Sequence, residues 1–493
     1  MRKPNLLFIM SDQHAQQVAG CYGDTIVATP SIDRLARRGV TFDNACTTSP
    51  ICVPARMSAL TARHAFRQDC WTNSDYLASD VPTMAHALGA AGYAPMLIGR
   101  LHALGPDQLH GYVRREIGDH SPNWIGIPRH DMGVLTNTNE PERVSITRSG
   151  PGRSAYEIKD ADVAAAAVAA ITALGRRTGA AADQPFALTV GLMLPHAPFV
   201  AAPADYARYA GRVGPARLRA QAAEHPWIRW WRENREIVDV PENEEVRART
   251  AYYALVDRMD RMIGTILDAL DAAGLADNTL VVYTSDHGEQ IGARGLWWKH
   301  TFYDESIKVP MILAWPGRLP EGERRAQVVN LMDLTAGVLD ALGAPALPNS
   351  DGRSLLPVAH ASATPWVDET FAEYCTDATP SWTGGMAVRQ RMIRAGRWKL
   401  IAYHGYRPQL FDLAADPDEV HDLAEDARHA CVRDALLQRV LADWDPDAID
   451  ARMRRRVADK QLLGAWARAT RPESTHLWHV TPEQNRLEHH ASA

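Results

Sequence analysis

Polar side chains able to bind a metal ion or an anion follow four separate apolar segments of this 493-residue chain. These are Asp12 and Gln13 after Asn5–Met10, Arg100 and His102 after Ala94–Ile98, His196 after Phe186–Met193, and Asp286 and His287 after Thr279–Thr284. In an open parallel sheet, ligands bind beyond the carboxyl ends of the strands. We therefore expect these residues to share one site at a single edge of a sheet.

Three of these residues form a plausible set of metal ligands. Asp12, Asp286 and His287 offer oxygen and nitrogen donors, which suit a hard or borderline divalent cation. Each aspartate alone is more often a helix cap or turn residue, but that explanation is much weaker for the three together. Thiol ligands are not evident in the set, which argues against structural zinc. Gln13 is expected either to add a carbonyl oxygen as a metal ligand or to contact the ligands without touching the metal.

A second signal lies in the segment Ser49–Thr61, which contains Cys52, Pro54 and Arg56. Proline favours the first turn of a helix, so Pro54 predicts a helix start with Cys52 just before it. The free N–H groups and the dipole at that end attract anions, and Arg56 lies one turn further on. A thiolate phosphatase needs five residues between cysteine and arginine, whereas three separate them here. The spacing therefore excludes a thiolate phosphatase.

The elements that must position these residues alternate between short apolar runs and helical patterns. This alternation predicts an α/β fold, with a large, mostly parallel sheet flanked by helices on both faces. Helical spacing of apolar residues predicts a helix over Arg247–Leu270. The segment Ala201–Glu245 reads as an insertion over one end of the sheet. Its tryptophans, Trp227, Trp230 and Trp231, belong either to a lid or cage or to simple packing.

The chain is too long for one hydrophobic core, so we expect two domains. Residues 1–345 are predicted to form the large catalytic domain. Residues 346–470 are predicted to form a smaller α+β domain with a short antiparallel sheet, and residues 471–493 an extended tail. Trp478 and Leu487 of that tail show no pattern for a core of their own, so we expect a neighbouring subunit to bury them.

Composition and charge exclude several classes of protein. The 53 Lys and Arg against 59 Asp and Glu give a charge of −6, which argues against a nucleic-acid binder. No apolar run approaches the roughly 20 residues that span a bilayer. The apolar run after Met1 is too short for a signal peptide and is read as a first strand, in a cytoplasmic protein. Six cysteines without close pairs do not form a disulfide framework.

These motifs together resemble the formylglycine-dependent sulfatases of the alkaline phosphatase superfamily. The signature Cys52-x-Pro54-x-Arg56 is accompanied, in family order, by segments that match over about residues 4 to 425: Asn5–Gln13, Thr29–Leu35, Pro195–Phe199, Ser285–Glu289, Lys299–Pro310, Gly396–Leu400 and Leu410–Leu413. Gly105–Gly111 is most similar to choline sulfatases. The pairing of Asp12-Gln13 with Asp286-His287 resembles that of choline sulfatases and, next, of phosphonate monoester hydrolases. The resemblance implies an alkaline-phosphatase-like fold. One departure is Arg100, which stands where sulfatases usually have lysine.

The resemblance also implies a mechanism. A formylglycine-generating enzyme would oxidise Cys52, and the hydrated aldehyde would attack the sulfur of a sulfate ester. One divalent ion, Mn²⁺ or Ca²⁺, would be held by Asp12, Cys52, Asp286 and His287. The implied roles of the remaining residues are stabilisation of the ester oxygens by Arg56, Arg100 and Lys299, proton donation to the leaving alkoxide by His196 and Lys299, and removal of a proton from the second hydroxyl by His102.

Three functions are compatible with these motifs. The first is hydrolysis of a small-molecule sulfate monoester (aryl, choline-like or another alkyl sulfate). The second is hydrolysis of phosphonate monoesters or phosphodiesters at the same site. His102 favours the sulfatase, because phosphonate hydrolases lack a histidine in this loop. A binding protein with a decayed site is disfavoured, because every charged position is filled. We expect no nucleic-acid or membrane partner, and a homo-oligomer, either a dimer or a tetramer.

Overall fold

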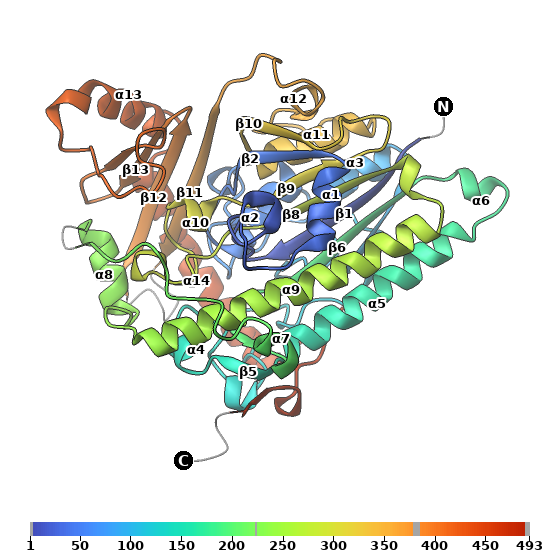
Figure 1. Cartoon of the computed structure of the whole chain (residues 1–493), viewed down its shortest axis with the longest axis horizontal. Helices are drawn as coiled ribbons and strands as arrows, with labels where there is room; N and C mark the ends of the chain where they lie inside the picture. The colour runs from blue at the N-terminus through green and yellow to red at the C-terminus, as the bar shows by residue number, and fades with distance from the viewer. Residues whose placement is uncertain (1–2, 222–223, 378–384, 489–493) are drawn as a thin grey trace.

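The computed structural model describes residues 3–221, 224–377 and 385–488, and its centre is an eight-stranded sheet (Figure 1). The strand order is β10-β2-β9-β8-β1-β6-β3-β4. The strands are β1 (Asn5–Asp12), β2 (Val40–Cys46), β3 (Ala94–Gly99), β4 (Arg114–Glu116), β6 (Phe186–Pro195), β8 (Thr279–Ser285), β9 (Met311–Ala314) and β10 (Glu323–Asn330). Only the pairings of β9 are antiparallel. This confirms the predicted α/β class with a large, mostly parallel sheet.

The three central strands β1, β6 and β8 are buried along their whole length. Strands covered on both faces have continuous apolar runs, which is why these segments were recognisable. Met10 of β1 lies opposite Gly191 of β6 and Thr284 of β8. The carboxyl ends of the three strands are therefore level, so the polar residues that follow them emerge at one edge.

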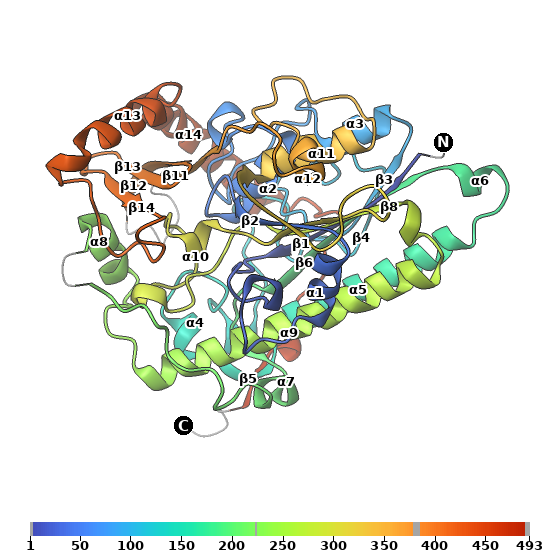
Figure 2. The same cartoon turned by 45° about the horizontal axis from the view of Figure 1, so that its top comes forward.

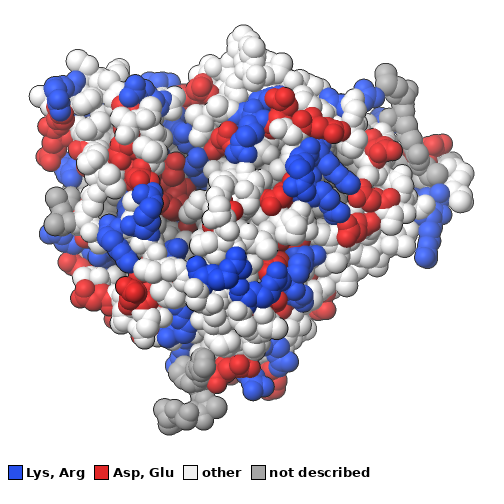
Figure 3. All heavy atoms as spheres, viewed as in Figure 1, with Lys and Arg blue, Asp and Glu red and all other residues white. Residues whose placement is uncertain are grey.

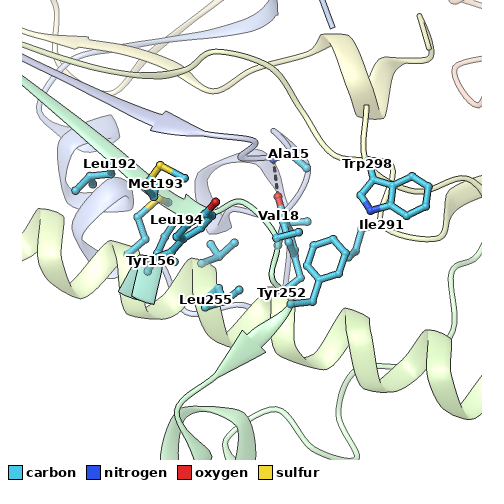
Figure 4. Packing of buried hydrophobic residues seen from close by; sticks show 14 of the residues in the cluster. Ala15, Val18, Tyr156, Leu192, Met193, Leu194, Tyr252, Leu255, Ile291 and Trp298 are labelled. Atoms are coloured by element: carbon cyan, nitrogen blue, oxygen red, sulfur yellow. Dashed lines mark hydrogen bonds between the residues drawn. The ribbon is translucent and has the colours of Figure 1, made fainter. Parts of the chain in front are cut away.

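Helices cover both faces of this sheet, as Figure 2 shows. One face is covered by α1 (Pro30–Arg37), α5 (Ala155–Gly175) and α9 (Glu242–Ala272), and the other by α2 (Cys52–Thr61), α3 (Met84–Ala90), α11 (Leu331–Ala341) and α12 (Leu356–His360). In Figure 4, Tyr252 and Leu255 of α9 pack near Tyr156 of α5 and Met193 of β6. The predicted helix over Arg247–Leu270 is confirmed in position, but α9 begins earlier because acidic residues in its first turn complement the helix dipole.

A separate four-stranded antiparallel sheet follows, as predicted. It is formed by β11 (Glu369–Asp377), β12 (Ala387–Ala395), β13 (Trp398–Tyr403) and β14 (Gln409–Asp412), with α13 (Ala430–Leu441) packed on it. The domain division near residue 345 stays a prediction. Leu355 and Val358, which lie beyond that point, still pack in the core of the large domain. The long helix α14 (Pro446–Thr470) then returns to the large domain, where Lys460 pairs with Asp75 at 2.8 Å.

The C-terminal tail packs on its own chain. β15 (Arg486–Leu487) pairs with β5 (Gly150–Arg153), which also pairs with β7 (Val200–Ala201). The Trp478 backbone N–H donates to Asp119 O at 2.8 Å, and the Trp478 indole donates to Asp162 at 3.0 Å. The expectation that a neighbouring subunit buries Leu487 was wrong, because backbone pairing already buries it on its own chain. Trp478 is half-buried here, so its further burial by a neighbouring subunit stays a prediction.

The segment 201–245 contains two short helices, α7 (Pro203–Ala207) and α8 (Pro226–Asn234). Trp227 and Trp231 of α8 are buried, and the Trp227 ring lies 5.8 Å from that of Tyr403 in the small sheet. Trp227 therefore joins the insertion to the small sheet, while the Trp231 ring stacks on that of Trp227 and lies 5.0 Å from the His300 ring. The remaining short helices are α4 (Val144–Thr147), α6 (Ala180–Asp183) and α10 (Asp304–Ile307).

The surface in Figure 3 carries basic and acidic side chains in alternating patches, and no stripe of one sign crosses this face. Among the helices of the described ranges, none has both the length and the apolar composition that a bilayer crossing requires.

Candidate active site

The four residues predicted to hold a metal ion lie together at the carboxyl edge of the large sheet. One ligand atom from each of Asp12, Cys52, Asp286 and His287 falls within 4.8 Å of the others, and all four side chains are buried. Asp12 ends β1, while Asp286 and His287 directly follow β8. Because Ser11 and Ser285 are register partners in these paired strands, the residues after them face the same space.

Cys52 enters this cluster from the opposite direction, as the first residue of α2. The helix begins two residues before Pro54, so Cys52 lies within its first turn. The Cys52 Sγ atom is 3.2 Å from His287 Nε2 and 3.7 Å from Asp12 Oδ1. Burial and the neighbouring Asp12 raise the pKa of the Cys52 thiol to about 11.

The donor chemistry of the cluster fits a hard or borderline divalent ion, with two carboxylates and one imidazole. His287 Nδ1 lies 3.0 Å from Gly288 O, so it carries the proton and leaves Nε2 free to bind a cation. Burial lowers the pKa of His287, which keeps the imidazole neutral. The Gln13 backbone N–H donates to Asp286 Oδ1 at 3.1 Å and holds that carboxylate in place.

Two arginines bracket the carboxylates. Arg56 Nε donates to Asp286 Oδ2 at 2.7 Å, and Arg100 Nε donates to Asp12 Oδ2 at 2.5 Å. Burial alone raises the pKa of Asp12, but the charges of Arg100 and Arg56 outweigh it and hold this pKa well below its usual range. The backbone of Arg100 packs directly against that of Gly191. Only glycine fits at position 191, because a Cβ there would lie 2.0 Å from Arg100 O.

Arg100 also fixes the orientation of His102. Arg100 Nη2 lies 2.7 Å from His102 Nδ1, and since arginine only donates, Nδ1 must accept and the ring proton belongs on Nε2. Burial and Arg100 hold the pKa of His102 well below its usual range, so the ring is neutral. The His102 backbone N–H donates to Asp119 Oδ2 at 2.8 Å.

His196 and Lys299 lie beside Asp12 on another side of the cluster. Lys299 Nζ donates to His196 Nε2 at 2.9 Å, and His196 Nδ1 donates to Ala197 O at 2.6 Å. Both contacts place the ring proton of His196 on Nδ1. Lys299 also donates to the side-chain oxygen of Gln13, whose amide group donates to Glu289. Gln13 therefore orients Lys299. The side-chain oxygen of Gln13 is already used in accepting this hydrogen bond.

The structure adds three residues that the sequence reasoning did not assign. Asp119 holds the loop that carries His102, Glu289 anchors Gln13, and the Tyr156 ring lies 6.1 Å from the His196 ring. Asp119 follows β4 at the same sheet edge, so the strand-end rule that found the others applies to it as well. Tyr156 lies inside α5, and no sequence pattern distinguishes it from a core residue.

Arg56, Arg100 and Lys299, all of them buried, thus surround Cys52 and the carboxylate pair. Such an arrangement can hold a tetrahedral anion over Cys52, with a cation on one side and proton carriers on the other. The chemistry that it suits is transfer of an anionic group from an ester to an oxygen nucleophile.

Comparison with known proteins supports this reading of the site. A family profile described as Sulfatase matches residues 4–344, and one described as N-sulphoglucosamine sulphohydrolase, C-terminal, matches residues 292–444. A choline-sulfatase of Rhizobium meliloti (strain 1021) is 32% identical over 484 residues, which covers 94% of this chain and 91% of that protein.

Two further relatives extend the comparison. The multifunctional alkaline phosphatase superfamily protein PehA of Trinickia caryophylli is 28% identical over 501 residues, covering 90% of this chain and 95% of that protein. The crystal structure of a phosphonate monoester hydrolase of Agrobacterium radiobacter has a TM-score of 0.73 and 24% identity, covering 89% of this chain and 95% of that one. This last likeness shows a shared fold.

Proposed function

Because this chain belongs to the sulfatase family of the alkaline phosphatase superfamily, and is a sulfuric ester hydrolase, we propose that it acts through formylglycine made from Cys52. The substrate is a small-molecule sulfate monoester, and the cofactor is one divalent ion, Mn²⁺ or Ca²⁺. The observation that carries this proposal is the position of Cys52. Its Sγ lies among the metal donors, 3.2 Å from His287 Nε2, at the start of a buried helix.

Asp12, Asp286, His287 and the modified side chain at position 52 would hold the cation. The bound cation supplies positive charge that polarises the sulfate group and favours the ionised form of an oxygen nucleophile. The hydrated aldehyde supplies two hydroxyls on one carbon, one to attack sulfur and one whose loss of a proton releases sulfate. Overall, the S–O bond to the alcohol breaks, and water provides the new oxygen of sulfate and the proton of the alcohol.

The other side chains bind the ester and move protons. Arg56, Arg100 and Lys299 stabilise the non-bridging oxygens by charge-assisted hydrogen bonds. Lys299 and His196 share a hydrogen bond, so together they can deliver a proton to the leaving oxygen. His102 is neutral and takes the proton of the second hydroxyl through Nδ1, which requires the Arg100 guanidinium to shift from Nδ1 onto the ester oxygens that it stabilises.

A second candidate function is hydrolysis of phosphonate monoesters or phosphodiesters at the same site. What raises it is the fold shared with the phosphonate monoester hydrolase of Agrobacterium radiobacter, together with the likeness to the multifunctional alkaline phosphatase superfamily protein PehA over 90% of the chain. Both functions use the same nucleophile and cation. The relative rates on an aryl sulfate and on a phenylphosphonate ester distinguish the two.

The test of the nucleophile combines mass spectrometry with mutagenesis. Co-expression with a formylglycine-generating enzyme is expected to raise specific activity in proportion to the aldehyde fraction in the peptide that contains Cys52. Cys52→Ala should abolish turnover while the fold stays intact. Cys70→Ala, at another buried free cysteine, serves as the matched control and should keep the activity. Active protein that carries only unmodified cysteine at position 52 would refute the mechanism.

The remaining partner is a second copy of the chain. We infer a dimer or a tetramer, and the surface that supports this lies on α14. Leu462 and Trp466 of that helix are 73% and 40% exposed. Large apolar side chains exposed together mark interaction surfaces in many proteins.

A further inference from the structure

The short helix α10 lies between the small antiparallel sheet and the candidate active site (Figures 1 and 2). On the side of the site, the backbone N–H of Gly288, the residue after His287, donates to Ser306 O at 2.8 Å. The contact is close, because a Cβ on Gly288 would lie 2.0 Å from Glu305 O. The backbone of α10 therefore supports the segment that carries the predicted metal ligand His287.

The same helix also supports the segment that leads to Cys52. The Thr47 backbone N–H, between β2 and α2, donates to Ile307 O at 2.8 Å. Lys299 lies on the chain just before α10, and Phe302 between them is completely buried. A displacement of α10 would therefore move the segments that carry three of the groups proposed to act in the reaction.

The small sheet holds α10 through Lys399 of β13. This side chain is completely buried, and its Nζ donates to Phe302 O at 3.0 Å. The same ammonium group donates to Asp304 Oδ1 at 2.5 Å and to Glu419 Oε1 at 2.6 Å, so its three N–H bonds are all in use. Glu419 Oε2 in turn accepts from the backbone N–H of Asp304 at 2.7 Å. Lys399 and Glu419 therefore hold the first residue of α10 from the side opposite the site.

Lys399 belongs to a cluster of opposite charges at this boundary. Arg394 Nη1 lies 3.9 Å from Asp304 Oδ2, and Arg294 Nη1 donates to Glu305 Oε2 at 2.6 Å. The cluster includes three cations and three carboxylates, namely Lys399, Arg394, Arg294, Asp304, Glu305 and Glu419. Buried ion pairs add little net stability, because desolvation offsets their attraction, but charge-assisted hydrogen bonds fix geometry. The cluster is therefore better suited to placing α10 than to stabilising the fold.

We propose that Lys399 is a positioning residue for the sulfatase reaction: through α10 it keeps Lys299 and the segment after His287 in their reactive places. The proposal rests on the sulfatase function proposed above and adds a residue from outside the large sheet. Because all three donors of Lys399 are used within the protein, this residue touches neither the substrate nor the cation. The small C-terminal sheet thus takes part in catalysis by placing the groups that do the chemistry.

The test is Lys399→Met, which keeps the length of the side chain and removes the ammonium group. We expect kcat on 4-nitrophenyl sulfate, per folded and aldehyde-bearing molecule, to fall at least about tenfold while KM changes less than about threefold, because small misplacements of catalytic groups slow the chemical step. The matched control is Lys460→Met in α14, a lysine that bridges Asp75 at 2.8 Å and Asp377 at 3.0 Å. This control should lower Tm and leave kcat and KM unchanged.

Amide hydrogen exchange tests the structural step of the proposal without any turnover. The Gly288 N–H is protected by its hydrogen bond to Ser306 O, and it exchanges only when α10 moves away. Peptides that contain Gly288 should therefore exchange about tenfold faster in Lys399→Met than in wild type, and at the wild-type rate in Lys460→Met. Unchanged exchange at Gly288 in folded Lys399→Met would overturn the proposal.

A second variant decides the question if Lys399→Met does not fold. Glu419→Gln keeps the shape of the side chain but loses the carboxylate oxygen that accepts from the Asp304 N–H, so we expect kcat to fall at least about threefold at unchanged KM. A folded variant with lower Tm but unchanged kcat would mean that the cluster only stabilises the fold, which overturns the proposal. If wild type hydrolyses no sulfate ester, the sulfatase function itself fails, whereas an active wild type with an equally active Lys399→Met refutes only the positioning role.

Discussion

Replacing Arg100 by alanine should lower kcat/KM on 4-nitrophenyl sulfate at least hundredfold. Its guanidinium contacts Asp12 Oδ2 at 2.5 Å and His102 Nδ1 at 2.7 Å, so it serves both the cation site and the proposed base. Loss of one transition-state donor costs about 10²–10³ in rate, and a hundredfold loss corresponds to about 2.7 kcal/mol. Folding should suffer less than for a fully unpaired buried charge, because Arg56 still pairs with Asp12 at 3.2 Å.

Arg100→Lys sharpens this experiment, because it keeps the charge but loses the planar fork. Lysine can contact Asp12 or His102 but not both, so we expect about a tenfold loss, between wild type and alanine. The matched control is Arg325→Ala, a buried arginine whose guanidinium donates to Val358 O and Ala359 O far from the site. This control should lower Tm and leave kcat/KM per folded molecule unchanged. A loss below about threefold in Arg100→Ala would refute the reasoning.

Two further predictions concern the cation and a buried lysine. Asp286→Ala should lose most of the bound metal in elemental analysis, and retention at wild-type stoichiometry would contradict the assigned ligand. Lys159 is fully buried, its Nζ has no hydrogen-bond partner among the described residues, and burial lowers its pKa to about 8 from 10.5. Folding must bury this charge below pH 8, so Lys159→Met should raise the free energy of unfolding at pH 7 by up to about 3 kcal/mol. Because wild type regains stability as Lys159 loses its proton, the gain should shrink between pH 8 and pH 10.5; an equal gain at all pH values in thermal melts would show another cause.

The central strands and the residues after them were predictable because burial leaves a clear mark on sequence. Continuous apolar runs identified β1, β6 and β8, and the strand-end rule then brought Asp12, His196 and Asp286 to one edge. The start of α2 was predicted two residues late, because Pro54 is tolerated within the first turn and does not have to open it.

Contacts between segments distant in sequence were not predictable. Tyr156 and His120 meet only because α5 packs under the loop after β4, and periodicity within either segment gives no sign of it. Leu487 in the tail was misjudged for the same reason. Trp478 and Leu487 have no local pattern, since their partners are Asp119, Asp162 and β5. Only the folded arrangement shows that the chain buries Leu487 itself.

The strand order of the large sheet also determines when, during translation, the site around Cys52 can form. Cys52 follows β2, which lies between β10 and β9, and β1 lies between β6 and β8. The site around Cys52 therefore cannot close until the ribosome has passed Asn330, the end of β10. At roughly 5–20 residues per second, the nascent chain exposes Cys52 for on the order of 15 to 55 seconds after Arg56 is made. If Cys52 is modified as proposed above, the modifying enzyme meets it in an unfolded peptide, and slower or faster translation should change the fraction of the protein that carries the aldehyde.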